Sequence, residues 1–271
     1  MKAFLIDLSI CNGCYCCQIA CKDEHVGNDW TPYAKPQPDT GQFWLKMDEK
    51  ERGTVPKVKV SYTPLLCTHC DDAKCMEVCE PKAIYRREDG MIIIDPAKCN
   101  GCKRCLDSCP SQSIYFNADL NIAQKCTGCS HLIDDGWDVP RCVDSCPTEA
   151  LRYGEESELR ELIGKAEFLD NGCGKGRVFY LNLPRKFVAG TVYDPVEKEV
   201  VIGATCTLTD KDGGAVHTVT TDNFGDFWFN DLPDGQAYSL KIQKDKAVRF
   251  VGDISTADDV NLGDIAMRLR D

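Results

Sequence analysis

The sequence of 271 residues lacks several features that mark common classes of protein. No run approaches the roughly 18 apolar residues of a membrane-spanning helix, so no membrane span is expected. Basic residues are in deficit, with 32 Lys and Arg against 43 Asp and Glu and a net charge of -11. Nucleic-acid binding needs clustered positive charge, so this balance argues against a nucleic-acid partner.

The usual signs of a catalytic site are also missing. There is no glycine-rich phosphate loop and no nucleophile placed beside a base, and the 4 histidines are scattered. We therefore expect that chemistry on a substrate takes place in a partner.

The opening segment, MKAFLIDLSICNGC, lacks the marks of a secretory signal. It has no apolar core of roughly 7–15 residues and no small-residue cleavage site. Hydrophobic and charged contents of 43% and 28% are those of a folded globular protein. We expect a cytoplasmic protein, with export of the folded chain on a partner's twin-arginine signal as the alternative.

Cysteine is abundant, with 19 in the chain. Such a supply indicates metal or redox chemistry, since disulfide frameworks belong to small secreted proteins. Three cysteines, Cys16, Cys173 and Cys206, are surplus and expected to be free thiols that pack. The others form four groups: Cys11, Cys14, Cys17, Cys21; Cys67, Cys70, Cys75, Cys79; Cys99, Cys102, Cys105, Cys109; and Cys126, Cys129, Cys142, Cys146.

The spacing within the groups is typical of iron–sulfur ligands. The first and third groups read C-x2-C-x2-C-x3-C, the run of bacterial ferredoxins, in which three thiolates surround one cubane and the fourth ligates its neighbour. The second and fourth groups are the variants C-x2-C-x4-C-x3-C and C-x2-C-x12-C-x3-C. Zinc prefers two separated pairs of cysteines and would suit the fourth group alone. We therefore predict four [4Fe–4S] clusters.

The order of the groups suggests two ferredoxin units, one nested inside the other. The phrases CEPKAIY, CPSQSIY and CPTEALRY follow three of the groups and form an internal repeat. Our hypothesis is that three cysteines of each group share a cluster with the last cysteine of another group. The sets are Cys11, Cys14, Cys17 with Cys146; Cys126, Cys129, Cys142 with Cys21; Cys67, Cys70, Cys75 with Cys109; and Cys99, Cys102, Cys105 with Cys79.

Polar residues within the cysteine loops are candidates for adjusting the clusters. His69, in CTHC, is a candidate donor to sulfur. Basic residues there can offset the cluster charge and raise reduction potentials, although we expect at least half to be ordinary surface charge. They are Lys22, Lys74, Lys103, Arg104, Lys125 and Arg141.

The fold class is predicted to be α+β, with a duplicated bacterial-type ferredoxin domain over residues 1–165 and an all-β domain after it. Residues 22–66 form an aromatic-rich insertion that either packs against the cluster core or offers a docking surface. Residues 156–165 predict a short helix, and residues 166–186 a linker. Over residues 187–271, six or seven short strands with Asp-, Gly- and Asn-rich turns predict a small antiparallel sandwich.

Residues 1–155 resemble the iron–sulfur subunits of molybdopterin oxidoreductases of the dimethyl sulfoxide reductase family, which have four such groups in this order. The phrases CKDEHVGNDW, YTPLLCTHC, REDGMIIIDP and IAQKCTGCSHLIDD are similar to those of the small subunits of pyrogallol–phloroglucinol transhydroxylases and their relatives. The later segment GATCTLTD…TTDNFGDFWFNDLPDGQAYSLKI resembles carboxypeptidase-regulatory or transthyretin-like modules.

The resemblance implies a non-catalytic electron-transfer subunit of an oxidoreductase. Its partner would be a large catalytic subunit with molybdenum or tungsten in a molybdopterin guanine dinucleotide cofactor, acting on a phenolic compound. The transhydroxylases have an incomplete third group, whereas this chain has it complete. A complete set suits net electron delivery, so dehydroxylation or hydroxylation stays level with transhydroxylation. The alternatives are a subunit of a respiratory molybdopterin reductase and a free-standing polyferredoxin.

Overall fold

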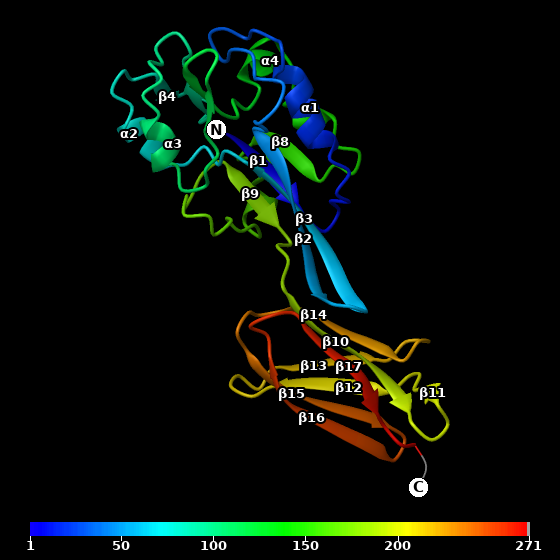
Figure 1. The fold of residues 1–271 in the computed structure, drawn as a ribbon. Coiled ribbons are helices and arrows are strands. Elements are labelled where there is room, and N and C mark those ends of the chain that lie inside the picture. Colours follow the sequence, from blue (N-terminus) through cyan, green and yellow to red (C-terminus); the bar gives the residue numbers. More distant parts are fainter. Residues whose placement is uncertain (270–271) are drawn as a thin grey trace. The chain divides into compact units, whose positions relative to one another are not determined.

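A computed structural model describes residues 1–269, and the chain divides into two compact units. Unit 1 comprises Met1–Glu49 and Tyr62–Leu183, and unit 2 comprises Lys50–Ser61 and Pro184–Asp271. Strands predominate in both units, and the helices are short (Figure 1). Within the described residues, no helix combines the length and the apolar character needed to cross a membrane.

Unit 1 consists of short elements that alternate with cysteine-bearing loops (Figure 1). The helix expected at residues 156–165 forms only over Arg160–Ile163. β2 (Leu45–Thr54) and β3 (Lys57–Leu66) pair as a ribbon whose tip belongs to unit 2. The other elements are β1 Lys2–Asp7, α1 Cys16–His25, α2 Lys74–Glu77, β4 Ile84–Arg86, β5 Ile92–Ile94, α3 Arg104–Ser108, β6 Tyr115–Asn117, β7 Ile122–Gln124, α4 Ser130–Asp134, α5 Arg141–Asp144, β8 Leu151–Glu155, α6 Arg160–Ile163 and β9 Val178–Leu181.

Each repeated phrase after a cysteine group forms a strand that pairs with the strand before another group. β4 pairs antiparallel with β5, with Ile84 opposite Ile94, and the Asp-Gly turn between them has φ 93° at Gly90. β6 pairs with β7 in the same way. β8 pairs with the distant β1, with Ile6 opposite Leu151. This last pairing brings the first and fourth cysteine groups together.

The segment expected to be a linker, residues 166–186, contributes a strand instead. This strand, β9, joins the sheet formed by β1 and β8. β9 lies parallel to β1, with Phe4 opposite Val178, and the strand order is β8–β1–β9. All four residues of β9 are buried, and Tyr180 donates a hydrogen bond from its hydroxyl to the carbonyl oxygen of Pro64 at 2.8 Å. A short apolar run beside a glycine-rich break has no periodicity that distinguishes a strand, so the sequence did not reveal β9.

The core of unit 1 is built around the cysteines. Trp44, Phe4 and Tyr180 are almost fully buried in one cluster, which also contains Cys17, Cys21 and other cysteines. A second cluster packs Ile84, Ile92 and Ile94 against more of them. Thiols therefore occupy positions that aliphatic side chains hold in an ordinary domain. The buried cysteines of the two clusters are Cys17, Cys21, Cys67, Cys126, Cys142, Cys79 and Cys105.

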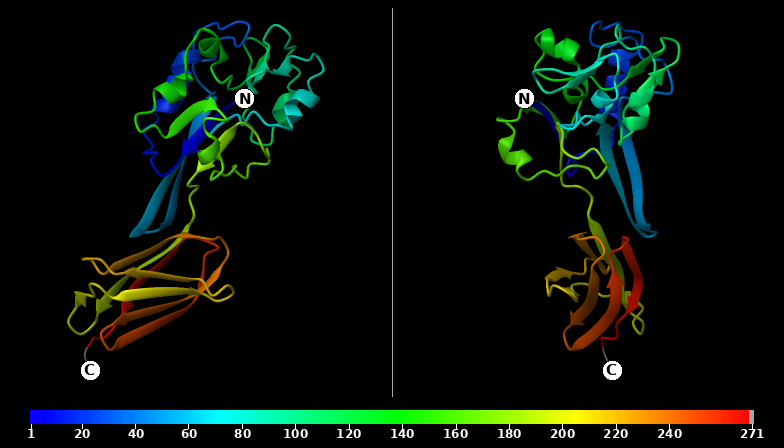
Figure 2. Two further views of the ribbon diagram at one scale, coloured as in Figure 1. Left: turned by 180° about the vertical axis from the view of Figure 1, so that it is seen from behind. Right: turned by 90° about the vertical axis from the view of Figure 1, so that its left-hand side faces the viewer.

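Unit 2 is a sandwich of two four-stranded sheets (Figure 2). One has the order β11–β10–β14, with β17 also paired to β10, and the other has the order β13–β12–β15–β16. Burial alternates along β12 and β15, so one face of each strand supplies the core. The strands are β10 Lys186–Asp194, β11 Glu199–Val200, β12 Thr205–Asp210, β13 Val216–Thr220, β14 Asp226–Leu232, β15 Ala237–Lys244, β16 Ala247–Ser255 and β17 Val260–Ala266.

One pairing corrects the expectation of a wholly antiparallel sandwich. β17 lies parallel to β10, with Val188 opposite Val260 and Val192 opposite Ile265. The chain reaches β17 by crossing from the other sheet, and such a crossover permits a parallel neighbour. Gly263, at φ 66°, interrupts the alternation of β17, which explains why its sequence was not recognised as a strand.

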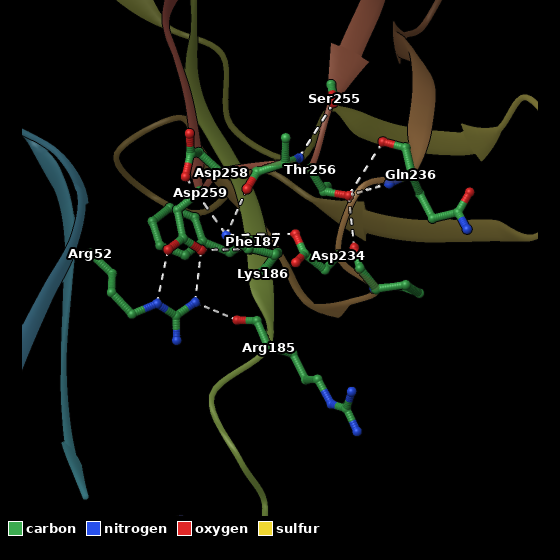
Figure 3. A network of polar contacts seen from close by, with 12 residues as sticks. Arg52, Arg185, Lys186, Phe187, Asp234, Gln236, Ser255, Thr256, Asp258 and Asp259 are labelled. Atoms are coloured by element: carbon green, nitrogen blue, oxygen red, sulfur yellow. Dashed lines mark hydrogen bonds and ion pairs between the residues drawn. The ribbon is translucent and has the colours of Figure 1, made fainter. Parts of the chain in front are cut away.

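The tip of the β2–β3 ribbon is held in unit 2 by polar contacts (Figure 3). Arg52 donates two hydrogen bonds to the carboxylate of Asp259, at 2.8 and 2.7 Å, and another to the carbonyl oxygen of Arg185. Asp259 also accepts a hydrogen bond from the backbone N–H of Phe187 at 3.0 Å. The side chains of Arg52 and Asp259 are 17% and 8% exposed, so this ion pair is largely shielded from water.

We expect Arg52→Ala to lower the free energy of unfolding of unit 2 by about 2 kcal/mol, because a shielded carboxylate loses its partner. Combined with Asp259→Asn, it should cost less than the sum of the single changes, giving a coupling of about 1–3 kcal/mol in thermal unfolding. The control pair is Lys211 and Asp253, where the carboxylate is 97% exposed and the coupling should be smaller. Strictly additive effects of Arg52→Ala and Asp259→Asn would contradict the assignment.

The pH dependence of the Arg52→Ala effect gives an independent check. Burial alone would raise the pKa of Asp259, but hydrogen bonds from Arg52 hold it below its ordinary value of 3.8. A depressed pKa in the folded state contributes stability above that ordinary value, and the contribution is lost as the pH falls through the folded pKa. The difference in stability between wild type and Arg52→Ala should therefore shrink below about pH 4.

Candidate metal centres

The four cysteine groups share a local backbone conformation. In each group the residue before the second cysteine has a positive φ, which glycine adopts at little cost. Three of these positions are glycine, so the sequence itself favours the turn between the first two cysteines. The positions are Gly13 at 69°, His69 at 46°, Gly101 at 72° and Gly128 at 63°.

Asparagine side chains fix the two CNGC loops further. The side-chain oxygen of Asn12 accepts a hydrogen bond from the backbone N–H of Cys14 at 3.2 Å, and Asn100 accepts one from Cys102 at 3.3 Å. These turns are of the kind that Asn favours. They position the cysteine backbone and leave both thiols available.

The structure brings Cys11, Cys14 and Cys17 close to Cys146. The thiols of Cys11, Cys146 and Cys14 all act on Cys17 by electrostatic repulsion, which helps to raise its pKa. The pairing of β1 with β8 accounts for this proximity, because Cys11 follows β1 and Cys146 precedes β8.

A second set contains Cys21, Cys126, Cys129 and Cys142. Cys126 and Cys129 both repel Cys21, and Cys142 is repelled by all three. These four residues are buried. Cys21 lies in α1, one turn beyond Cys17, so this helix supplies thiols to two neighbouring sets.

The remaining two sets line separate hollows. Cys67, Cys70, Cys75 and Cys109 line a cavity of about 270 Å³, far more space than one metal ion needs. Burial raises the pKa of Cys105, and repulsion from Cys99 and Cys102 adds to the rise. The lining of the other hollow includes Cys105 and the rest of its set. That set is Cys79, Cys99, Cys102 and Cys105.

Burial opposes negative charge on these thiols. Removal from water, together with repulsion from nearby thiols, raises the pKa of Cys17 to about 12, of Cys126 to about 11 and of Cys129 to about 12. Four thiolates in one such site require compensating positive charge. Iron supplies this charge, and the cavity lined by Cys67, Cys70, Cys75 and Cys109 has room for several iron atoms. The donor sets therefore fit iron–sulfur clusters.

Lys125 is the buried cation among the basic residues of the cysteine loops. It is 2% exposed, and its Nζ donates hydrogen bonds to the carbonyl oxygens of Ile92 and Cys126. Burial raises the pKa of Cys126 in the second set and of Cys75 in the third, and the charge of Lys125 offsets part of this rise in both. Lys74, Arg104 and Arg141 instead form ion pairs with acidic side chains near the surface, as expected for at least half of the group.

His69 is fully buried in the Cys67–Cys70 loop. Its Nδ1 accepts a hydrogen bond from the backbone N–H of Ile92 at 2.9 Å, and burial, reinforced by the charge of Lys125, holds its pKa well below 6.5. The imidazole is therefore neutral and carries its proton on Nε2, which has no hydrogen-bond partner among the described residues. A free donor at this position fits the predicted role.

The aromatic-rich insertion at residues 22–66 packs against the second cysteine set. Trp44 is 2% exposed and lies against the ring of His25, with ring centroids 4.5 Å apart. The Nε2 of His25 is 4.0 Å from the sulfur of Cys129. His25 was not among the expected site residues, although its place on the same helix as Cys21 could have indicated it.

The three surplus cysteines have different surroundings. Cys206 is fully buried in the core of unit 2, where it packs as expected. Cys16 is exposed at the start of α1. Cys173 is 8% exposed and lines the same cavity as Cys70.

Comparison with known proteins identifies both parts of the chain. Residues 58–156 match the model of the 4Fe-4S dicluster domain. Residues 188–268 match the model of the carboxypeptidase regulatory-like domain. The two matches fall in different units of the structure for most of their length.

Relatives fall into two kinds according to how much of the chain they match. The pyrogallol hydroxytransferase small subunit of Pelobacter acidigallici is 35% identical over 253 residues, covering 89% of this chain and 90% of that one. The probable anaerobic dimethyl sulfoxide reductase chain YnfG of Escherichia coli K12 is also 35% identical, but over 59% of this chain and 77% of its own. The arsenate respiratory reductase iron–sulfur subunit ArrB of Shewanella is 40% identical over 42% of this chain and 44% of its own.

The CNGC loops lead to a prediction about Gly101. A Cβ there would lie 2.5 Å from the backbone oxygen of Asn121, whereas one at Gly41, which also has a positive φ, would meet nothing within 4 Å. Gly101→Ala and Gly41→Ala both carry a backbone cost of about 1–2 kcal/mol, but only Gly101→Ala adds a clash. The thermal unfolding midpoint of unit 1 should fall further in Gly101→Ala. Equal shifts of the unfolding midpoint in the two variants would show that the loop around Gly101 accommodates the added Cβ at no further cost.

Proposed function

This chain belongs to the family of iron–sulfur small subunits of molybdopterin oxidoreductases, which includes the pyrogallol hydroxytransferase small subunit, and on that premise we propose that it carries electrons through four [4Fe–4S] clusters. The partner is a large catalytic subunit with molybdenum or tungsten bound to molybdopterin guanine dinucleotide. Its substrate is a phenolic aromatic, and the reaction is a transhydroxylation, dehydroxylation or hydroxylation. We propose that the protein works in the cytoplasm, with export of the folded chain on a partner's twin-arginine signal as the alternative.

The observation that carries this proposal is the grouping of sixteen cysteines into four sets. Each set combines three thiols from one sequence group with one from another. When bound, a [4Fe–4S] cluster supplies a site that gains and loses one electron reversibly. The proposed ligands are set one, Cys11, Cys14, Cys17 and Cys146; set two, Cys21, Cys126, Cys129 and Cys142; set three, Cys67, Cys70, Cys75 and Cys109; and set four, Cys79, Cys99, Cys102 and Cys105.

The sets follow one another in a single series. Thiols of adjacent sets act on one another electrostatically, linking set one to set two, set two to set three, and set three to set four. Sets one and four each include an exposed cysteine, Cys14 and Cys102, while set two is buried. This order supports entry and exit of electrons at the two ends. The linking pairs are Cys142 and Cys17, Cys126 and Cys67, and Cys105 and Cys75.

The carboxypeptidase regulatory-like domain favours a phenolic substrate over the alternatives. The relative from Pelobacter matches 89% of the chain, and the two respiratory reductase subunits match 59% and 42%. A respiratory partner remains the second candidate because those subunits share the cysteine-rich part. A free-standing polyferredoxin would purify as a lone chain without a large subunit.

The chain purified without oxygen, together with its partner, should contain about 16 iron atoms and 16 sulfides per chain of this protein. Cys21→Ala and Cys126→Ala should disrupt the same cluster, so the double variant should lose no more iron than the more affected single variant. Cys126→Ala with Cys146→Ala should instead give additive losses, because the two residues belong to different sets. A large subunit should co-purify, and iron analysis with electron paramagnetic resonance measures the outcome. Zinc in place of iron would refute the proposal.

Lys125→Met should lower the reduction potentials associated with sets two and three by tens of millivolts, because a shielded positive charge near both is lost. Lys125→Arg should restore most of the potential, since it keeps the charge. Lys98→Met removes a lysine whose side chain is 61% exposed and should leave both potentials unchanged. Redox titration monitored by electron paramagnetic resonance makes the comparison. Equal potentials in wild type and Lys125→Met would exclude this role for Lys125.

A further inference from the structure

Cys173 is the fifth cysteine of the set-three cavity. Cys67, Cys70, Cys75 and Cys109 supply the four thiols that a cluster requires, yet Cys173 lines the same cavity with Gly172 and Gly174 on either side of it. Cys173 and Cys70 line this cavity together, and each thiol acts on the pKa of the other. Cys173 lies within residues 166–186, which the sequence predicted to be a linker.

The neighbours of the two thiols are also shared. The hydroxyl of Thr68 is 3.0 Å from the sulfur of Cys70 and also bonds Cys173. Ser111, two residues after the ligand Cys109, bonds Cys173 as well. The Thr68 hydroxyl can therefore stabilise sulfur at the position of Cys70 and at that of Cys173.

The loop that carries Cys173 is fixed in place by its backbone. Gly172 and Gly174 have φ of 76° and 63°, and a Cβ on Gly172 would lie 2.9 Å from the Cβ of Pro110. The Asn171 side chain accepts a hydrogen bond from the backbone N–H of Cys173 at 3.1 Å. Glycine at residue 172 thus allows the loop to approach the Cys109–Pro110 segment closely.

Further backbone contacts fasten the loop to the Cys67–Cys70 segment. The N–H of Asp71 bonds the carbonyl oxygen of Lys175 at 3.0 Å, and the N–H of Arg177 bonds that of Thr68 at 2.7 Å. A Cβ at Gly176 would lie 2.4 Å from the same Thr68 oxygen. The approach of the two segments therefore depends on glycine, and it holds Cys173 against the cavity.

We propose that Cys173 is a reserve ligand of the set-three iron–sulfur site, able to bind iron in place of Cys70. This inference rests on the proposed function, because it requires a cluster at set three. The replacement is a ligand exchange without electron transfer: the iron–sulfur bond to Cys70 breaks and its thiolate takes up a proton, while an iron–sulfur bond forms to Cys173, whose thiol proton passes to solvent.

The test compares Cys70→Ala, Cys173→Ala and the double variant, each purified without oxygen in the complex. Cys70→Ala should keep the wild-type iron content and [4Fe–4S] signal, and Cys173→Ala should do the same. The double variant should lose up to about four iron atoms per chain. Cys75→Ala is the matched control, since it removes a different thiol from the same cavity and should lose iron although Cys173 is present.

Equal iron contents in Cys70→Ala and the double variant would overturn the inference. Iron loss in Cys173→Ala alone would overturn it too, because the thiol would then be needed while Cys70 is present. The wild-type chain separates this failure from that of the proposed function. A wild-type chain without iron and sulfide refutes the proposed function itself, whereas one with its full iron content confines the failure to Cys173.

Discussion

Repulsion among closely placed thiolates in a dry interior is the constraint on which unit 1 depends. Burial raises the pKa of Cys17 and Cys129 to about 12, so these sites favour protonated thiols unless positive charge is supplied. Cys17 and several other cysteines of the sets pack in the core among its aromatic and aliphatic side chains. Binding of iron and folding of unit 1 are therefore coupled, because the proposed ligands are also core residues. Lys125 contributes a fixed charge between two of the sets.

Long-range strand pairing decides which thiols meet. β1 and β8 come from opposite ends of the cysteine-rich sequence, and their antiparallel pairing brings Cys146 to the first cysteine group. The β4–β5 hairpin connects the second cysteine group to the third, and the β6–β7 hairpin connects the third to the fourth. In both hairpins the paired strands are neighbours in the sequence. A strand that follows one cysteine group thus pairs with a strand that precedes another at both short and long sequence separation. This pairing produces the nested order of the groups.

The sequence predicted the parts of the site that depend on local spacing. The C-x2-C turns require a positive φ, and glycine at residues 13, 101 and 128 signals it directly. Side chains that depend on tertiary packing gave no such signal. Cys173 lies in a glycine-rich stretch typical of a loop, and His25 approaches Cys129 only after the helices pack. β9 and β17 were missed because their own residues lack a clear period, since β9 is a short apolar run and Gly263 interrupts the alternation of β17.

The composition of unit 2 has a consequence for how the protein is made. Residues 50–61 belong to this unit, but the rest of it begins only at Pro184. During synthesis, Arg52 leaves the ribosome long before Asp259, which lies 207 residues later in the chain. The ribbon tip therefore remains without its partner until Asp259 has been synthesised. Unit 2 is consequently not an appendage that one cleavage between the units could release intact.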